Sequence, residues 1–323
     1  MKIALMVNRG NFERYSGYEK IPSDWELVHL GNGPVDEDKL AATDAEVILV
    51  DSILPISARV INKMPNLKLI HTQGVGFNYV NLEAARKAGV YVCNNAQVNS
   101  GAVAEQAILL MLAVLRNFRE NEDMVYDAKQ IEAKNRCFEN ALTELGDCHV
   151  GIIGLGAIGR EVAGRLRAFG CKLSYYSRRE VPDCDMPRLT LDDIYSECDI
   201  ITLHVPVTEE TIGMIDEAAF NKMKPGAILI NTARGELVDQ EALCRALSDG
   251  RLGGAGIDTL YPEPVQADNP LLNLPQEVRK KVALSPHIGG ITAGCFRRGY
   301  TNFWNNVRII SEGGRPFNMV NGL

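Results

Sequence analysis

Apolar and polar residues alternate regularly over the first hundred residues of the chain. Short apolar runs predict strands at 2–7, 25–30, 47–50, 68–72 and 90–94, and helix-like segments lie near 56–64 and 82–88. Strands that alternate with helices are typical of a parallel sheet in an α/β domain. Residues 103–115 then predict a long apolar helix with no strand partner nearby, which suits a connector that a neighbouring domain or subunit must cover.

A second α/β series begins at residue 149. The pattern predicts a strand at 149–154, a helix at 157–169 and a strand at 172–177, followed by strands at 199–205, 227–233, 254–259 and 282–285. A last helix, at about 292–311, is expected to return to the first domain because the residues after it are too few to form a core. The sequence therefore predicts two doubly wound parallel-sheet domains with a cleft between them, residues 1–98 with 292–323 and residues 99–291.

The composition agrees with two domains and limits the classes of molecule that the protein is expected to bind. The chain has 323 residues, of which 46% are hydrophobic, so it holds enough apolar material for two cores. Lysine and arginine number 34 against 41 aspartates and glutamates, and this net charge of −7 gives no general attraction to nucleic acid or to an anionic membrane. A small-molecule partner is expected instead.

Neither a targeting segment nor a metal site is expected. The first apolar run has five residues and the longest, 107–115, has nine, which is too short for a secretory signal or a membrane span. The eight cysteines contain no CxxC pair, and no histidine has a second histidine or a cysteine pair at ligand spacing. These features predict a cytoplasmic protein with reduced thiols and no metal.

A glycine-rich turn follows the first strand of the second series. Gly154, Gly156 and Gly159 form GLGAIG directly after an apolar strand and at the start of a helix, which is the context of a dinucleotide fingerprint. The first glycine permits a tight turn, the second lets the backbone approach a pyrophosphate, and the third lets the helix pack on the strand. The amides of Ala157 and Ile158 are then expected to face the pyrophosphate at the positive end of the helix. The alternative is a glycine-rich turn without a ligand, which the strand, the helix and the spacing together disfavour.

The end of the following strand predicts which dinucleotide is bound. An acidic residue about 20 positions after the glycine turn would bind the ribose 2′-hydroxyl of NAD, but here the strand ends in Ser177, Arg178 and Arg179. A hydroxyl and two guanidinium groups suit a 2′-phosphate, so NADP is favoured over NAD. The alternative is that both arginines are solvated and that NAD binds without the acid.

Three segments place titratable residues just past expected strands, where a doubly wound sheet exposes its ligand side. Arg234 can bind a carboxylate through two hydrogen bonds and polarise a neighbouring carbonyl, the alternative being a surface ion pair with Asp239 or Glu241. His287 is the candidate acid or base, because imidazole has a reference pKa of about 6.5. Glu263, between two prolines, can fix the imidazole tautomer and favour its protonated form. Taken alone, the histidine could be structural and the glutamate a solvated turn residue.

Together these segments resemble the D-isomer-specific 2-hydroxyacid dehydrogenase family. The resemblance runs from about residue 68 to residue 321 and rests on seven segments in order: TQGVGFNYVN, NSGAVAEQAILLML, VGIIGLGAIGREVA, LHVPVTEETIGMI, NTARGELVDQEAL, GAGIDTLYPEP and SPHIGGIT. It implies a Rossmann cofactor domain at 99–291, a flavodoxin-like substrate domain at 1–98 and 292–323, and hydride transfer between NAD(P)H and the C2 carbon of a small 2-oxo or 2-hydroxy acid.

The resemblance also implies roles for single residues. Arg234, Glu263 and His287 would form the catalytic triad, and the amides of Val75 and Gly76 would hold the substrate carboxylate. The remaining expected cofactor contacts are Val205, Pro206, Thr232, Asp258, His287 and Gly289, of which Thr232 and Asp258 would meet the nicotinamide carboxamide.

Three points depart from this resemblance or are left open by it. Ser177 replaces the usual acid, which puts a preference for NAD in doubt. A protein that senses dinucleotide without turnover, as related corepressors do, is the alternative from another functional class, because a fold alone never fixes function. The identity of the acid is open.

A homodimer is expected through the cofactor domain, because the apolar helix at 103–115 has no obvious cover within the chain.

Overall fold

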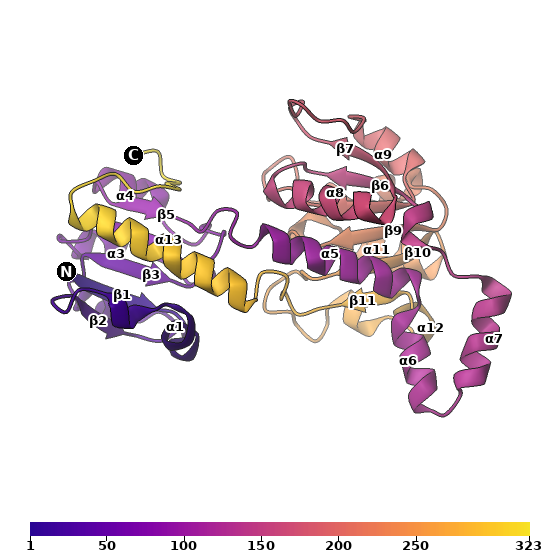
Figure 1. Ribbon diagram of the computed structural model, residues 1–323, viewed down its shortest axis with the longest axis horizontal. Helices are drawn as coiled ribbons and strands as arrows, with labels where there is room; N and C mark the ends of the chain where they lie inside the picture. Colours follow the sequence, from indigo (N-terminus) through magenta and orange to yellow (C-terminus); the bar gives the residue numbers. More distant parts are fainter. The chain divides into compact units, whose positions relative to one another are not determined.

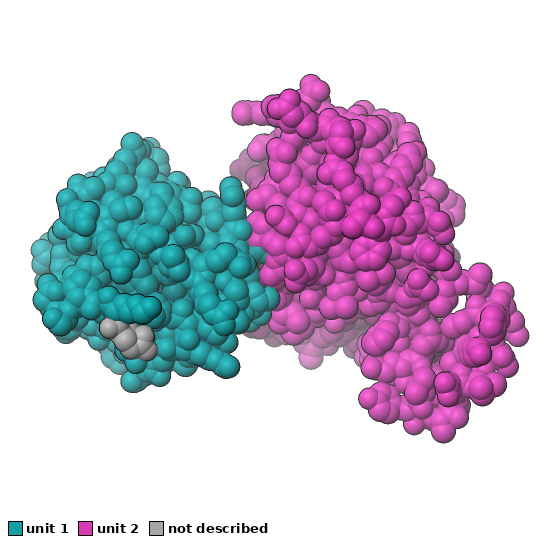
Figure 2. Space-filling view, in the orientation of Figure 1, with its two compact units in different colours: residues 1–99, 291–323 teal, residues 100–290 magenta. Residues whose placement is uncertain are grey.

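The computed structural model describes residues 1–323 apart from the side chain of Glu19, and it contains two compact units. Unit 1 comprises residues 1–99 and 291–323, and unit 2 comprises residues 100–290 (Figure 2). Each unit has its own parallel β-sheet with helices packed on it (Figure 1). The predicted fold class, two parallel-sheet α/β domains, is confirmed.

The unit 1 sheet has five parallel strands in the order β2-β1-β3-β4-β5, which is the flavodoxin-like order. The strands are β1 Lys2–Met6, β2 Glu26–His29, β3 Val47–Val50, β4 Leu69–Thr72 and β5 Tyr91–Cys93. The helices are α1 Arg9–Tyr15, η1 Tyr18–Lys20, α2 Glu37–Ala41, α3 Ala58–Lys63, α4 Leu82–Lys87 and α13 Ala293–Ser311.

Alternation along the unit 1 strands sends their side chains to two cores, one on each face of the sheet. On one face, Ile3 and Leu49 pack with Phe303 and Trp304 of α13. The other face forms a second cluster with side chains of α2, α3 and α4. Helix α13 begins where the Thr292 hydroxyl accepts a hydrogen bond from the Cys295 amide. Because its aromatic side chains pack on the sheet, the last helix belongs to the core of unit 1.

The unit 2 sheet has six parallel strands in the order β11-β10-β9-β8-β6-β7. A single parallel bridge between Tyr175 and Arg188 adds one more short segment beside β7. With that segment counted as the third strand of the unit, the order becomes 3-2-1-4-5-6-7, the arrangement of dinucleotide-binding sheets. The strand order reverses between β6 and β8, and ligands of such sheets bind at the carboxyl ends of the strands at this point.

The strands of unit 2 follow the predicted series closely. The strands are β6 His149–Ile153, β7 Lys172–Tyr176, β8 Ile200–Leu203, β9 Ala227–Asn231, β10 Leu252–Ile257 and β11 Val282–Leu284. The helices are α5 Ser100–Leu115, α6 Phe118–Tyr126, α7 Gln130–Asn140, α8 Ala157–Phe169, α9 Leu191–Glu197, α10 Glu217–Lys222, α11 Gln240–Ser248 and α12 Gln276–Arg279, with short 3-10 turns η2 Leu145–Asp147, η3 Gly235–Leu237 and η4 Pro270–Asn273.

Helix α5 differs from its expectation, because unit 2 itself covers most of it. It packs against α8 and against strands β9, β10 and β11, and Ala107 and Met111 are fully buried in this cluster. Close packing is possible because β10 carries Gly254 and Gly256 under the helix. A Cβ atom at Gly256 would lie 2.8 Å from the Cβ of Leu110. The prediction that α5 has no strand partner and needs another domain or subunit to cover it was therefore wrong.

Among the described residues no single helix is long and apolar enough to cross a bilayer, although α5 and α6, bent by 63° at the break between them, are so as a pair. All eight cysteines are free thiols. The described residues contain no group of three or more histidine, cysteine, aspartate or glutamate side chains that could hold a metal ion.

Candidate active site

The glycine turn connects β6 to α8 at the carboxyl end of the unit 2 sheet. Gly154 has φ +100°, and a Cβ there would lie 2.5 Å from the carbonyl oxygen of His204. A Cβ at Gly159 would collide with the Gly154 carbonyl, so both positions require glycine. A Cβ at Gly156 would project into open space. This opening lies at the start of α8, where no side chain caps the helix, so backbone and helix dipole are free to meet an anionic pyrophosphate.

The end of β7 lies beside this turn. The Gly154 amide donates a hydrogen bond to the Tyr176 carbonyl at 2.9 Å, and the next residue, Ser177, is half-buried. The Ser177 hydroxyl donates to the Arg179 carbonyl, whereas the side chains of Arg178 and Arg179 are exposed. This strand end carries the hydroxyl and the two cations that were expected in place of an acid.

One carboxylate comes near these arginines from the segment that follows β8. The pKa of Glu210 lies below its ordinary value, mainly because the Thr208 hydroxyl donates to its carboxylate at 2.7 Å. The positive charge of Arg178 contributes to the same lowering. Arg178 is therefore within electrostatic reach of an exposed anion, which would compete with a phosphate for it.

Arg188 is a residue at this strand end that the sequence interpretation missed. Its Nε and Nη2 donate to the Ser177 carbonyl at 3.2 and 2.9 Å, and Nη2 also donates to the Arg178 carbonyl at 3.1 Å. The residue lies eleven positions after Ser177, in a segment without a strand pattern. Only its pairing beside Tyr175 brings it here.

Arg234 follows β9 at the same edge of the sheet. The chain turns after the strand because the Asn231 side chain donates to the Arg234 carbonyl at 2.8 Å and accepts from the Ala233 amide at 3.0 Å. A Cβ at Gly235 would lie 2.6 Å from the Leu260 carbonyl carbon, so this loop packs directly on the loop after β10. Among the described residues no carboxylate pairs with Arg234. Its Nη1 donates to the Ala233 carbonyl at 2.7 Å, which leaves other N–H groups for a ligand.

Glu263 and His287 meet directly. The His287 Nδ1 lies 2.9 Å from Oε1 and 2.8 Å from Oε2 of Glu263, while the two side chains are 35% and 50% exposed. The glutamate loop is held by Gln240 and Asn269, which both donate to the Tyr261 carbonyl. With Nδ1 engaged by the carboxylate, Nε2 remains for proton exchange with another molecule.

Asp258 fixes the backbone that carries His287. The residue is 2% exposed, and its carboxylate accepts hydrogen bonds from the Ser285 hydroxyl at 2.5 Å, the Ile288 amide at 3.1 Å and the Gly289 amide at 2.9 Å. The His287 amide donates to the Asp258 carbonyl at 2.8 Å. His287 has φ +54°, a conformation that few non-glycine residues adopt, and these bonds on both sides stabilise it.

A second residue missed by the sequence interpretation supports this arrangement. Gln106 on α5 donates to the Ser285 hydroxyl at 2.9 Å, which in turn donates to Asp258. Gln106 lies in the apolar helix pattern, so its sequence position gave no signal of a polar contact. Because the described residues already supply three donors to Asp258, its expected contact with a nicotinamide carboxamide stays a prediction.

The remaining expected cofactor residues lie along the same end of the sheet. Val205, just past β8, approaches the glycine turn, since a Cβ at Gly154 would lie 2.8 Å from its Cγ1. Pro206 follows it, and its carbonyl accepts from the Thr211 hydroxyl at 2.7 Å. Thr232, just past β9, is buried, and its hydroxyl has no hydrogen-bond partner among the described residues. A buried hydroxyl without a partner is costly, so it suits a polar ligand atom.

In unit 1, Val75 and Gly76 form the loop after β4. Asn94 donates from Nδ2 to the Val75 carbonyl at 2.7 Å, and the Gly74 amide donates to the Ser52 hydroxyl oxygen at 2.9 Å. Asn95 donates from its side chain to the Gln73 carbonyl at 2.7 Å. The side chains of Ser52, Asn94 and Asn95 thus fix the backbone of this loop. The amides of Val75 and Gly76 donate to no group in the described part of the chain, so both can bind an anion.

Comparisons with known proteins show what the chain is similar to. Residues 108–289 match the model of the "D-isomer specific 2-hydroxyacid dehydrogenase, NAD binding domain" family. The chain is 33% identical to glyoxylate reductase of Korarchaeum cryptofilum, with 99% of the chain and 96% of the relative covered. It is 36% identical to D-3-phosphoglycerate dehydrogenase of Mycobacterium tuberculosis over 88% of the chain, but it spans only 53% of that relative. The crystal structure of D-lactate dehydrogenase from Aquifex aeolicus, complexed with NAD and lactic acid, superposes with a TM-score of 0.84 at 29% identity, with 100% of both chains covered.

Proposed function

Because the chain belongs to the D-isomer-specific 2-hydroxyacid dehydrogenase family, we propose that it transfers hydride between NAD(P)H and the C2 carbon of a small 2-oxo or 2-hydroxy acid. The observation that carries this proposal is the contact of 2.8 Å between His287 and Glu263 at the sheet end that also carries Arg234. Unit 2 is then the dinucleotide-binding domain and unit 1 the substrate domain.

Three side chains of unit 2 have different roles toward the 2-oxo acid. Arg234 presents a planar fork of N–H groups that can bind a carboxylate and polarise the adjacent C2 carbonyl. The bound dinucleotide supplies or accepts the hydride. In reduction, His287 donates a proton from Nε2 to the C2 oxygen, and Glu263 stabilises the imidazolium that precedes this step. In unit 1, the unpaired amides of Val75 and Gly76 would hold the substrate carboxylate.

The glycine turn supports dinucleotide binding, and the strand end supports NADP over NAD. Gly156 leaves an opening at the start of α8 for a pyrophosphate. Ser177, Arg178 and Arg179 supply a hydroxyl and cations, and no carboxylate, at the place of the ribose. The matched family model is named for NAD, and the Aquifex relative was crystallised with NAD, so the proposed preference for NADP rests on the strand end of this chain and not on the comparisons.

A dinucleotide-sensing protein without turnover is the alternative on the same fold. Such a protein needs the glycine turn but has no need of a histidine that contacts a carboxylate while its other ring nitrogen stays free. The His287–Glu263 contact therefore favours an enzyme.

The substrate and the proposed activity are tested together by one panel. Purified protein is mixed with NADH or NADPH and with glyoxylate, hydroxypyruvate, pyruvate or bulkier 2-oxo acids, and nicotinamide absorbance is followed. We expect oxidation of the reduced dinucleotide with at least one acid, and glyoxylate and pyruvate head the panel because the relatives are named for glyoxylate and D-lactate. No oxidation with any acid, in protein that still binds dinucleotide, would support the sensing alternative.

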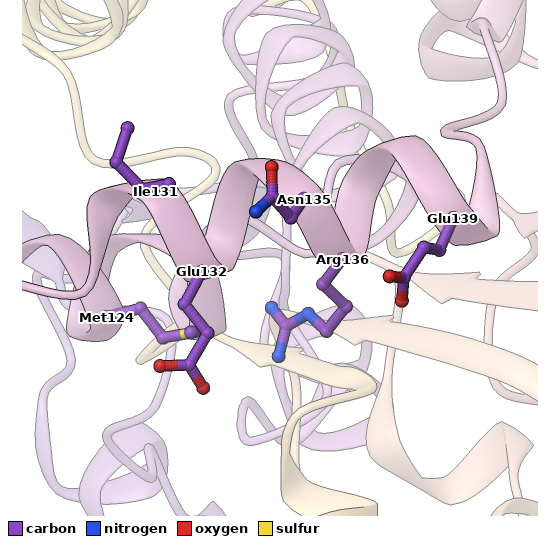
Figure 3. A pocket seen from close by; sticks show the side chains of 6 residues that line it. All are labelled: Met124, Ile131, Glu132, Asn135, Arg136 and Glu139. Atoms are coloured by element: carbon purple, nitrogen blue, oxygen red, sulfur yellow. The ribbon is translucent and has the colours of Figure 1, made fainter.

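We further propose that the protein forms a homodimer through unit 2. Helices α6 and α7 form a hairpin that projects from the rest of this unit (Figure 1). Arg136 of α7 joins the two helices, because its guanidinium donates to Glu120 at 2.5 Å and to Asn121 at 2.9 Å. A hollow of about 510 Å³ lies along α7, with Ile131 on one side of the helix and Glu132 and Arg136 on the other (Figure 3).

This hairpin and the adjoining helix expose several large apolar side chains. They are Leu109 at 57%, Phe118 at 58%, Val125 at 56%, Tyr126 at 84%, Ile131 at 66% and Phe138 at 75%. Exposed apolar side chains on neighbouring elements mark interaction surfaces, and a two-fold axis would let the same surface cover itself in a second copy.

Light scattering at micromolar concentration tests the dimer. We expect twice the mass of one chain, and we expect Tyr126→Glu combined with Phe138→Glu to shift the protein toward the monomer, because each buries a charge in an apolar interface. Tyr79→Glu, at a tyrosine of unit 1 that is 56% exposed, is the matched control and should leave the mass unchanged. A monomeric mass for the unsubstituted protein would contradict the proposal.

A further inference from the structure

The cations at the end of β7 differ in what already binds them. Arg178 lies within electrostatic reach of Glu210, whose pKa is lowered in part by it. Arg188 has no carboxylate partner among the described residues, and its guanidinium is instead fixed on two backbone carbonyls, those of Ser177 and Arg178. Carbonyl oxygens orient a guanidinium but do not neutralise it. Arg188 is thus the best-fixed uncompensated positive charge at this strand end.

The fold sets the place of this charge. The Leu189 amide donates to the Tyr175 carbonyl at 2.9 Å, and the Tyr175 amide donates to the Pro187 carbonyl at 3.0 Å. These two bonds hold Arg188 beside β7, where the third strand of a dinucleotide-binding sheet would lie. Its side chain then reaches Ser177, the residue directly after the Tyr176 carbonyl that accepts from the glycine turn. The adenosine ribose of a bound dinucleotide lies between that turn and that strand end.

We infer that Arg188 determines specificity for the 2′-phosphate of the dinucleotide, an inference that rests on the proposed NADP preference and assigns its main cation. Nε and Nη2 are occupied by the loop carbonyls, whereas Nη1 has no acceptor among the described residues and carries two N–H groups. A guanidinium that is already oriented loses little side-chain entropy when it binds a phosphate. All three arginines are exposed, but the side chains of Arg178 and Arg179 make no hydrogen bond among the described residues and must be ordered at that moment.

The experiment compares two small probes that differ only in the 2′-phosphate, adenosine 2′,5′-bisphosphate and AMP, by calorimetric titration of the full chain. In the unsubstituted protein the bisphosphate should bind at least 10-fold more tightly. Arg188→Met keeps the aliphatic stem and removes the charge, and it should weaken the bisphosphate about 10-fold while AMP changes less than about 3-fold. Arg188→Lys keeps the charge without the fork and should lie between the two. Arg245→Met, at an exposed arginine of α11 paired with Glu217, is the control.

The outcomes separate the two proposals. If the unsubstituted protein binds both probes equally, the NADP preference fails and this inference fails with it. If it prefers the bisphosphate and Arg188→Met keeps that preference, the NADP proposal stands, and the proposal that Arg188 determines specificity is overturned. Equal weakening of both probes by Arg188→Met would show that the residue only shapes the loop, which also overturns it. Thermal unfolding of each variant confirms that the titrated protein is folded.

Discussion

Replacement of His287 by Gln is expected to lower turnover by about 10²–10⁴, because the reduction loses its proton donor. The affinity for the dinucleotide should change little, since the glycine turn and the end of β7 are untouched. Single-turnover kinetics with a 2-oxo acid from the panel, together with a fluorescence titration of the dinucleotide, measure both quantities. His29→Gln, at a half-buried histidine of unit 1, serves as the control and should keep normal turnover. Near-normal turnover in His287→Gln would show that another group is the acid.

Glu263→Gln separates the charge of the partner from its hydrogen bond. The amide can still accept from Nδ1, so the imidazole keeps its orientation, but the negative charge 2.8 Å from the ring is lost. Loss of this charge removes an electrostatic interaction that stabilises the imidazole ring while it carries the proton to be transferred. We therefore expect kcat for reduction to fall, by a smaller factor than in His287→Gln. An unchanged kcat would identify Glu263 as a turn residue only.

Most strands could be placed from the sequence because each is a short apolar run bounded by turn residues. The expected strand at 227–233 ends earlier, at Asn231, because that side chain binds the backbone of Ala233 and Arg234 and turns the chain. The strand expected at 254–259 begins earlier, at Leu252. Its start was not predicted because three glycines within LGGAGI weaken the apolar pattern. Two of those glycines, Gly254 and Gly256, lie against α5. The sequence pattern therefore hid both the strand start and the cover of the helix.

The residues of the candidate site could also be predicted only in part from the sequence. Glycines, an arginine and a histidine just past apolar strands are visible in a sequence, because the ends of parallel strands meet at one edge of a sheet. Gln106 and Arg188 were missed, since each contributes through a partner far along the chain: Ser285 for Gln106, and the carbonyls beside β7 for Arg188. Helices α6 and α7 were also not predicted. Both are rich in charged and polar residues, so a search for apolar runs passes over them.

Catalysis with NADPH is expected to be more efficient than with NADH. A 2′-phosphate at Ser177 could gain one or two charge-assisted hydrogen bonds, each worth about 1.5–3 kcal/mol before exposure to solvent weakens it. Even half of one such bond corresponds to a several-fold preference in kcat/KM, since about 1.4 kcal/mol is a factor of ten. Steady-state kinetics with both reduced dinucleotides, at saturating 2-oxo acid, give this ratio directly.

Two substitutions test opposite sides of this contact. Ser177→Asp should lower kcat/KM for NADPH by like-charge repulsion and improve NADH, because the carboxylate can accept from the ribose hydroxyl. Arg178→Ala should raise KM for NADPH with little effect on NADH, and the effect should be moderate because Glu210 already attracts this guanidinium. Glu210→Gln is the matched counterpart, since removal of that competitor should lower KM for NADPH alone. If the unsubstituted protein uses NADH at least as well and Arg178→Ala alters neither KM, these arginines are solvated surface groups. The cofactor is then NAD, bound without an acid at the strand end.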